Sequence, residues 1–373
     1  MRNKVVLFFP PYDGPPLGPP LALLSLASPL LAKGFRVRII DSAITPKPEE
    51  TIARELDGAL CFGVSLLTGP MIRDAVKVSQ WVKSLRPDLP VIFGGWHPSL
   101  LPAQTLESRS VDIVVRGQGE LTLLEIAQRL AEGGDLIGVR GCSVKSTVGI
   151  HANPERPVEN IGHLPTPAFH LGEIDAYERR SGVRKVAYAT SVGCPYACNY
   201  CTDMVFYQRR FNAYPAGRVI NEVTDLVSRY RLSEVAFLDS NFPVDVKRAV
   251  AIARGFVESR AKFRWSFQAS TDLLCRMSDD EVQLLGESGV SHMGFGTESA
   301  SPEVLALMNK KHQRIEEMYE TARKSDAAGI RVTFNLILGY PGETEQDRLQ
   351  TFRIMSDISR RHDNVSFSPN IFT

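Results

Sequence analysis

The most informative segment of this chain is Val186-Ala187-Tyr188-Ala189-Thr190-Ser191-Val192-Gly193-Cys194-Pro195-Tyr196-Ala197-Cys198-Asn199-Tyr200-Cys201. It begins as an apolar run typical of a buried strand and ends in a loop with the spacing C-x3-C-x2-C. The other three of the six cysteines, Cys61, Cys142 and Cys275, are scattered among apolar neighbours, as small core residues are in a reducing compartment. Cysteines crowded into one short loop are instead typical of metal ligands.

The number of thiolates indicates which metal centre they hold. Four thiolates close a structural zinc or iron–sulfur site, whereas three leave one metal position open. On a [4Fe–4S] cluster, an open position can bind the amino group and carboxylate of S-adenosylmethionine, whose sulfonium then takes an electron from the cluster. The alternative is a zinc knuckle with a fourth ligand elsewhere, such as Asp203 or a distant histidine. Zinc sites usually pair two C-x2-C knuckles, and the sequence has no second knuckle.

The cysteine loop follows the first of six apolar runs that alternate with helical segments. The runs are 186–190, 235–238, 265–269, 293–295, 332–338 and 365–368. Six strand–helix repeats predict a partial, TIM-like (β/α)6 barrel over residues 185–373, with its chemistry at the carboxyl ends of the strands. The chain stops directly after the sixth run, so we expect it to be a fragment of a longer protein.

Residues 1–144 show an earlier alternation of strands and helices. The apolar runs are 5–9, 37–40, 60–65, 91–93 and 113–115. They predict an α/β domain with a doubly wound parallel sheet that binds ligands beyond the carboxyl ends of its strands.

Residues 145–184 lose this periodicity and contain four prolines, so we expect an extended linker. The linker holds His151, His163 and His170, whose loose spacing favours ordinary linker residues over a metal site.

Length and charge restrict the classes of function. A chain of 373 residues exceeds what one core usually serves, which predicts two domains. A net charge of +1 gives no reason to expect a nucleic-acid partner or an anionic membrane surface. No apolar run is long enough to span a bilayer, and the first run is too short for a signal peptide, so we expect a cytoplasmic protein.

The cysteine loop, with Tyr200 just before its last cysteine, resembles the radical S-adenosylmethionine superfamily. This resemblance implies that Cys194, Cys198 and Cys201 hold a [4Fe–4S] cluster, and that reduction of S-adenosylmethionine yields a 5′-deoxyadenosyl radical. Later strand ends resemble the motifs that hold this cofactor in the family. The residues implied, besides Tyr200, are Asp239, Ser240, Gln268, Glu298, Ser299, Ile337 and Gly339. Asp239, Glu298 and Glu343 also fit ordinary strand-end or helix-cap acids.

The front domain resembles the cobalamin-binding domain of the cobalamin-dependent branch of that superfamily. The residues implied lie after the first, third, fourth and fifth strands, and are Pro11, Ser65, Leu66, Thr68, Gly94, Gly95, His97, Gly117, Gly119 and Glu120. The fingerprint Asp-x-His-x-x-Gly is absent after Asp13, so we expect no histidine ligand to cobalt from that loop. His97 is the one candidate ligand to cobalt, but a loop-turn or tail-phosphate contact is favoured for it. A domain that has lost cobalamin, or that binds only substrate, would show similar glycines.

Together the two resemblances imply methyl transfer to an unreactive carbon or phosphorus centre of a small molecule, lipid or natural product. They also imply an electron donor such as flavodoxin or ferredoxin. One alternative is a radical cyclase or rearrangement enzyme with the same cofactors, and another is a non-catalytic iron–sulfur or cobalamin sensor. A methylthiotransferase is disfavoured because the front domain has only Cys61 and Cys142. Tyr207, Arg209 and Arg210 fit contacts to an acidic substrate or a solvated charged turn equally well.

Overall fold

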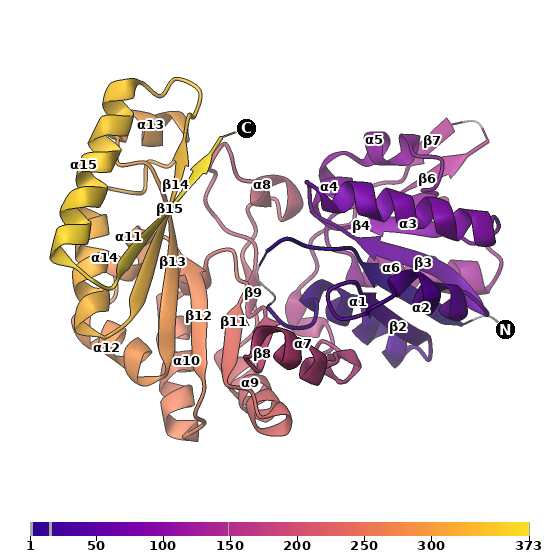
Figure 1. The fold of residues 1–373 in the computed structure, drawn as a ribbon, viewed down its shortest axis with the longest axis horizontal. Helices are drawn as coiled ribbons and strands as arrows, with labels where there is room; N and C mark the ends of the chain where they lie inside the picture. Colours follow the sequence, from indigo (N-terminus) through magenta and orange to yellow (C-terminus); the bar gives the residue numbers. More distant parts are fainter. Residues whose placement is uncertain (1–2, 15–16, 148, 373) are drawn as a thin grey trace. The chain divides into compact units, whose positions relative to one another are not determined.

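The computed structural model describes residues 3–14, 17–147 and 149–372, which divide into two compact units (Figure 1). The front unit comprises residues 1–184, and the barrel unit comprises residues 185–373.

The sheet of the front unit has the strand order β2-β1-β3-β4-β5-β6-β7. Its five parallel strands are β1 (Lys4–Phe9), β2 (Arg36–Asp41), β3 (Ala59–Ser65), β4 (Val91–Gly94) and β5 (Ile113–Val115). The parallel sheet predicted from the apolar runs is thereby confirmed. The hairpin of β6 (Cys142–Ser146) and β7 (Gly149–Ala152) adds antiparallel strands beyond β5. It was not predicted, because β7 is exposed throughout and lacks an apolar run.

Helices cover both faces of this sheet, since successive side chains of a strand point to opposite faces. On one face, Val6 and Phe8 of β1 share a core with α2 (Pro48–Glu55) and α3 (Met71–Leu85). On the other face, Val5 and Leu7 share a core with α1 (Leu21–Ala32) and α6 (Glu120–Ala131). The strand β3, packed from both sides, is buried along its whole length. Two short helices, α4 (Trp96–Leu100) and α5 (Pro102–Glu107), follow β4.

The segment 145–184, expected as an extended linker, instead packs onto the front unit. It contains β7, the 3-10 turns η1 (Ile161–His163) and η2 (Phe169–Leu171), and helix α7 (Ile174–Ser181). Phe169 and Tyr177 are buried, and the Tyr177 hydroxyl hydrogen-bonds Asp41 at the end of β2. The apolar residues that anchor this segment are widely spaced and do not recur at the period of a helix or a strand. For this reason the sequence pattern resembled a linker. Its three histidines are exposed.

The barrel unit holds a six-stranded parallel sheet in the order β15-β14-β13-β12-β11-β8 (Figure 1). The strands are β8 (Lys185–Tyr188), β11 (Glu234–Phe237), β12 (Arg264–Ala269), β13 (Val290–Glu298), β14 (Arg331–Leu338) and β15 (Val365–Ile371). The helices that follow them are α9 (Ala216–Tyr230), α10 (Val246–Ser259), α11 (Thr271–Cys275), α12 (Asp279–Glu287), α13 (Pro302–Leu307), α14 (Ile315–Ala327) and α15 (Glu345–Arg361). Within the described residues β15 and β8 do not pair, so the predicted partial barrel is confirmed.

Aromatic side chains fill the space between the barrel strands and their helices. Phe237 lies 5.0 Å from Trp265 between ring centroids, and Phe256 meets Trp265 edge-on at 5.5 Å. Alternate side chains on the other face of the strands, such as Gln268 and Thr333, are not buried. The strands therefore turn one packed face to the helices and one open face to the interior of the partial barrel.

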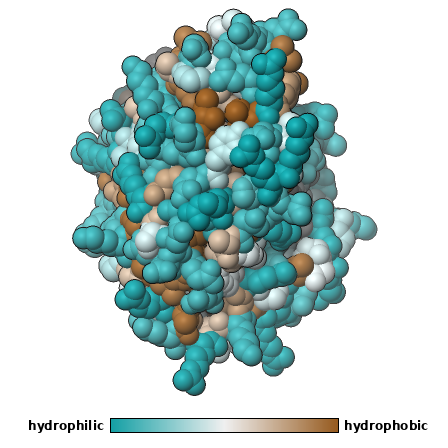
Figure 2. Space-filling model, turned by 90° about the vertical axis from the view of Figure 1, so that its left-hand side faces the viewer, coloured by the Kyte–Doolittle hydropathy of each residue, from teal (hydrophilic) through white to brown (hydrophobic). Residues whose placement is uncertain are grey.

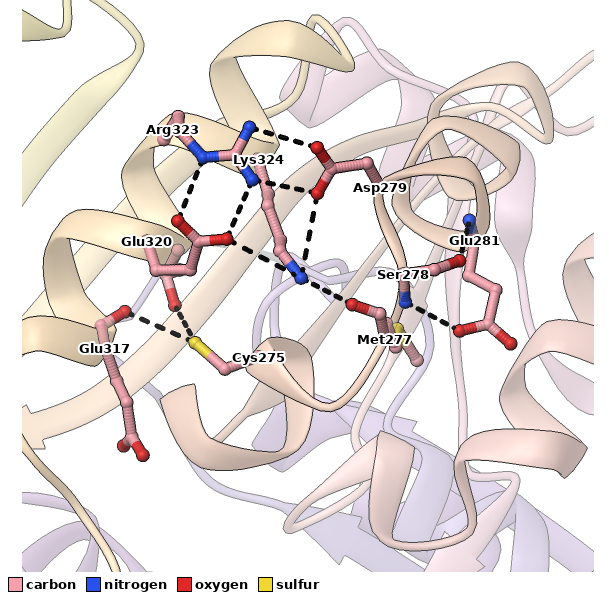
Figure 3. A network of polar contacts seen from close by, with 10 residues as sticks. Cys275, Met277, Ser278, Asp279, Glu281, Glu317, Glu320, Arg323 and Lys324 are labelled. Atoms are coloured by element: carbon pink, nitrogen blue, oxygen red, sulfur yellow. Dashed lines mark hydrogen bonds and ion pairs between the residues drawn. The ribbon is translucent and has the colours of Figure 1, made fainter.

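A network of charged side chains ties α14 to the turn between α11 and α12 (Figure 3). The buried ammonium of Lys324 donates to the carbonyl of Met277 and lies 3.7 Å from both Asp279 and Glu320. Arg323 binds Asp279 through two nitrogens, at 3.1 and 2.8 Å. The network fixes the helical layer behind β12 and β13.

The outer side of the barrel unit formed by α15 is mainly hydrophilic, with small separate hydrophobic areas (Figure 2). In the described part of the chain, no helix combines the length and the apolar character needed to cross a bilayer.

Candidate active site

The cysteine loop begins just beyond β8 and passes through β9 (Ser191–Val192), which pairs with β10 (Asn212–Ala213). Gly193 then turns the chain in a left-handed conformation, with φ at 75°. A Cβ on this residue would overlap the carbonyl oxygen of Arg210, so glycine lets the two segments pass closely. The β9–β10 ribbon thus fixes where the loop leaves the sheet.

The three cysteines of the loop lie close enough that the neighbouring thiolates raise the pKa of Cys194 and of Cys201. Cys198 is buried, whereas Cys194 and Cys201 are partly exposed. Burial raises the pKa of the Cys194 thiol, and it raises that of Cys201 to about 11. Hydrogen bonds from backbone N–H groups lower both pKa values and so oppose the effect of burial. The Tyr196 N–H donates to the Cys194 sulfur, and the Asp203 N–H donates to the Cys201 sulfur. Hydrogen bonds of this kind to sulfur tune iron–sulfur clusters.

The donor chemistry of the cysteine loop suits an iron–sulfur cluster. Among the residues that the structure describes, no three His, Cys, Asp or Glu side chains converge as ligands of one metal ion. Three thiols on one loop match a [4Fe–4S] cluster that keeps one iron open.

Asp239, expected to contact S-adenosylmethionine, holds the base of the cysteine loop. Its Oδ2 accepts from the Thr190 backbone N–H at 3.0 Å, and its Oδ1 accepts from the hydroxyls of Thr190 and Ser191. The buried guanidinium of Arg248 donates to the Thr190 carbonyl at 2.8 Å. Burial raises the pKa of Asp239, while these hydrogen bonds and Arg248 oppose the rise. Both carboxylate oxygens are thus engaged by the protein; the neighbouring Ser240 is exposed and hydrogen-bonds Asp203.

Asn241, which was not expected at the site from the sequence, reaches the cysteine loop from the same strand end. Its side-chain nitrogen lies 3.9 Å from the Cys194 sulfur and donates to Ser270 Oγ at 3.1 Å. Its Oδ1 accepts from the Ser270 backbone N–H at 3.2 Å. The position directly after Asp239-Ser240 was the one available signal for this contact.

Glu298 lies in a bulge at the end of β13. The pairing register of β13 with β14 shifts between Gly296 and Glu298, and Glu298 has a left-handed backbone with φ at 61°. A bulge of this kind re-aims a side chain at the end of a strand. The Glu298 carboxylate is buried and accepts from the Tyr200 hydroxyl at 2.8 Å and from Lys310 Nζ at 3.1 Å. Tyr200 and Glu298 were expected from the sequence, whereas Lys310 was not.

The remaining residues expected to hold S-adenosylmethionine lie at neighbouring strand ends. Ser299 is buried, with its hydroxyl 3.4 Å from that of Thr351. Gln268 points along the open face of the sheet, where a Cβ on the adjacent Gly294 would collide with it. Gly339 is left-handed, with φ at 78°, and its N–H donates to Glu343. Ile337 precedes it on the open face of β14.

The strand ends of the front unit form an edge of small residues. Ser65 at the end of β3 is in register with Gly94 at the end of β4. Gly95 is left-handed, with φ at 96°, and a Cβ there would lie 2.6 Å from the Leu66 carbonyl oxygen. The two strand ends can approach this closely only because Gly95 lacks a side chain. Such a strand-end edge fits the tail of a corrinoid, which needs close backbone approach.

The other residues implied for cobalamin surround this edge. His97 is buried in α4, with Nδ1 3.3 Å from the hydroxyl of the exposed Thr68, and desolvation lowers the pKa of its imidazole. The Gly117 N–H donates to Ser99 at 3.0 Å. Gly119 is the N-cap of α6, which begins at Glu120, and burial raises the pKa of Glu120. Pro11 is exposed in the loop after β1.

A three-thiol loop on a partial parallel barrel, preceded by a doubly wound domain, defines a radical S-adenosylmethionine enzyme of the cobalamin-binding type. Residues 188–355 match the radical SAM superfamily, and residues 14–127 match the B12 binding domain. The chain belongs to the radical SAM superfamily and carries a B12-binding domain, with a [4Fe–4S] cluster, S-adenosylmethionine and cobalamin as its cofactors. The superfamily predicted from the cysteine motif is thereby confirmed.

Three known proteins illustrate the likeness. The chain is 30% identical to an uncharacterized methyltransferase, PH0819, of Pyrococcus horikoshii, over 92% of this chain and 76% of the relative. It is 25% identical to the anaerobic magnesium-protoporphyrin IX monomethyl ester cyclase of Rubrivivax gelatinosus, over 91% of this chain but only 62% of the cyclase. Its fold matches the radical S-adenosylmethionine methyltransferase TsrM of Kitasatospora setae with a TM-score of 0.84 and 21% identity, over 99% of this chain and 75% of TsrM.

Proposed function

We propose that this enzyme transfers a methyl group from S-adenosylmethionine to an unreactive carbon or phosphorus centre of a small molecule, lipid or natural product. The observation that carries the proposal is the presence, in one chain, of a three-thiol loop on a partial barrel and a B12-binding domain. The relative from Pyrococcus horikoshii, a methyltransferase by name, supports this reaction over others.

In this proposal Cys194, Cys198 and Cys201 hold the cluster, while the strand ends around Glu298 and Gly339 hold S-adenosylmethionine. The edge formed by Ser65 and Gly95 holds the corrinoid. When bound, these groups supply the electron that cleaves the sulfonium and the cobalt centre that carries the methyl group. The protein fixes the positions of these groups. Asp239 and Asn241 orient the cysteine loop. Glu298 accepts hydrogen bonds from the protein only through Oε1 among the described residues, which leaves Oε2 available to S-adenosylmethionine.

An electron donor and a reducing location complete the proposal. Cleavage of the sulfonium consumes one electron, so we infer that flavodoxin or ferredoxin reduces the cluster. The six cysteines are free thiols, which supports a cytoplasmic location.

The test uses the anaerobically reconstituted chain with cobalamin, reductant and S-adenosylmethionine. We expect 5′-deoxyadenosine and, in addition, S-adenosylhomocysteine, which forms only when the methyl group leaves the cofactor. Formation of 5′-deoxyadenosine alone, with no S-adenosylhomocysteine at any cobalamin concentration, would refute methyl transfer. Replacing dithionite by reduced flavodoxin tests the proposed donor.

Ring closure or rearrangement with the same cofactors is the second candidate, because the chain also resembles the cyclase of Rubrivivax gelatinosus. S-adenosylmethionine with a trideuterated methyl group separates the two reactions once a substrate is found. A product heavier by one labelled methyl group supports methyl transfer, and an unlabelled product supports the cyclase.

A further inference from the structure

Lys310 closes a ring of three hydrogen bonds between the cysteine loop and the end of β13. Its ammonium donates to the Tyr200 hydroxyl at 3.0 Å and to Glu298 Oε1 at 3.1 Å, while the Tyr200 hydroxyl donates to the same Oε1 at 2.8 Å. The Lys310 residue is 5% exposed and Glu298 is 7% exposed. A charged pair this deeply buried is costly unless its members stay paired, so loss of Lys310 would leave a buried carboxylate unpaired.

The backbone around this ring leaves little freedom for it to rearrange. Glu298 sits in the bulge with a left-handed backbone, and a Cβ on Gly296 would lie 2.6 Å from Glu298 Oε1. The chain next to Lys310 also grips the cysteine loop directly. Asn309 donates to the Ala197 carbonyl at 2.7 Å, and Asn199 donates to the Leu307 carbonyl at 3.1 Å.

The ring uses only one oxygen of the Glu298 carboxylate. Oε1 accepts from both Tyr200 and Lys310, whereas Oε2 has no hydrogen-bond partner among the described residues. The carboxylate therefore has a fixed rotation and one available acceptor. Tyr200 lies between Cys198 and Cys201, so the same ring also fixes the last turn of the cysteine loop.

We propose that Lys310 is a positioning residue that couples the cysteine loop to S-adenosylmethionine binding by holding Tyr200 and the Glu298 carboxylate in one orientation. The proposal rests on the proposed function only in placing S-adenosylmethionine beside Glu298. Lys310 itself touches neither cofactor; it acts through Glu298 and Tyr200.

The test compares Lys310→Met with Lys311→Met, a control that removes the next lysine, which is exposed. Both variants are reconstituted without oxygen. We then measure their iron content, their affinity for S-adenosylmethionine by equilibrium dialysis, and the electron paramagnetic resonance spectrum of the reduced cluster. Because all three thiols remain, we expect Lys310→Met to keep its iron, to bind S-adenosylmethionine at least about tenfold more weakly, and to lose the spectral change that this ligand causes. Lys311→Met should match the wild-type chain in all three. Unchanged affinity and spectral response in Lys310→Met would overturn the proposal.

A double-mutant cycle with Glu298→Gln separates positioning from simple support of the fold. If Lys310 acts through Glu298, the double variant loses less affinity for S-adenosylmethionine than the product of the two single losses. Losses of affinity that multiply in the double variant would show that Lys310 acts independently and would contradict the proposal. Lys310→Gln, which keeps a hydrogen-bond donor, takes the place of Lys310→Met if the latter does not fold.

These measurements need no substrate, so they separate this inference from the proposed function. A chain that binds S-adenosylmethionine normally but makes no S-adenosylhomocysteine contradicts only methyl transfer. A wild-type chain without affinity for S-adenosylmethionine contradicts both.

Discussion

Replacing Gly193 by alanine should damage the cysteine loop more than its small size suggests. A left-handed backbone costs a residue with a Cβ about 1–2 kcal/mol, and the new Cβ would also overlap the Arg210 carbonyl oxygen. Forcing an extra carbon into a packed site costs about 1–3 kcal/mol more. The sum, about 2–5 kcal/mol, exceeds most single substitutions and falls on the segment that presents Cys194.

The matched control is Gly329→Ala, in the same unit. Gly329 is also left-handed, with φ at 66°, but has no atom within 4 Å of a built Cβ. Thermal unfolding without the cluster should show the smaller loss for Gly329→Ala, at about 2–4 °C for each kcal/mol in a domain of this size. Iron per chain after reconstitution should fall only in Gly193→Ala. Equal unfolding temperatures and equal iron contents in the two variants would refute the steric argument.

Three further predictions concern other parts of the molecule. Cys198→Ala should abolish 5′-deoxyadenosine formation, measured by chromatography of the reaction, and leave corrinoid binding intact, measured by the absorption of bound corrinoid. Retained 5′-deoxyadenosine formation would contradict the assignment of Cys198 as a cluster ligand. Gly95→Ala should lower bound corrinoid, whereas Gly69→Ala, left-handed but with open space around its Cβ, should not; equal corrinoid content would count against the strand-end edge. The hydrogen bonds from Arg323 lower the pKa of the Asp279 carboxyl in the folded chain. The Arg323–Asp279 ion pair therefore stabilises the fold fully above pH 3.8, the pKa of Asp279 in the unfolded chain, and this stabilisation is lost as the pH falls through the lower pKa of the folded chain. Arg323→Gln should therefore unfold at a lower temperature than wild type at pH 7, with a difference that shrinks below about pH 4; a constant difference would exclude this ion pair as its source.

The parallel strands and the cysteine loop could be predicted because their signals are local. An apolar run buried from both sides predicts a strand of a parallel sheet whatever its neighbours are, and β3 is buried at all seven positions. The spacing of the cysteines likewise depends only on adjacent residues. The hairpin of β6 and β7 gave no such signal, because β7 lies exposed at the edge of the sheet.

The roles of single polar residues depended on contacts that sequence order does not reveal. Asp239 was expected to bind the cofactor, and in the structure both its oxygens also accept from Thr190 and Ser191, which are 49 and 48 residues away. Lys310 reaches Tyr200 across 110 residues, and Glu298 can accept from both only because a bulge re-aims its side chain. A strand-end acid is visible in a sequence, but its orientation is decided by the register of the strands on either side.

With Cys194, Cys198 and Cys201 as the proposed metal ligands, these long-range contacts explain how a loop that supplies only three ligands can be held firmly. The protein cannot fix a cluster through a fourth thiolate without closing the position that the substrate-activating cofactor needs. It fixes the loop itself instead, from the end of β11 through Asp239 and Asn241, and from the chain after β13 through Asn309 and Lys310. Each of these residues reaches the loop only once the parallel sheet has formed. In this proposal, the open iron position and the many hydrogen bonds around the loop follow from the same constraint. Contacts from the completed barrel hold the loop in place of a fourth ligand to the cluster.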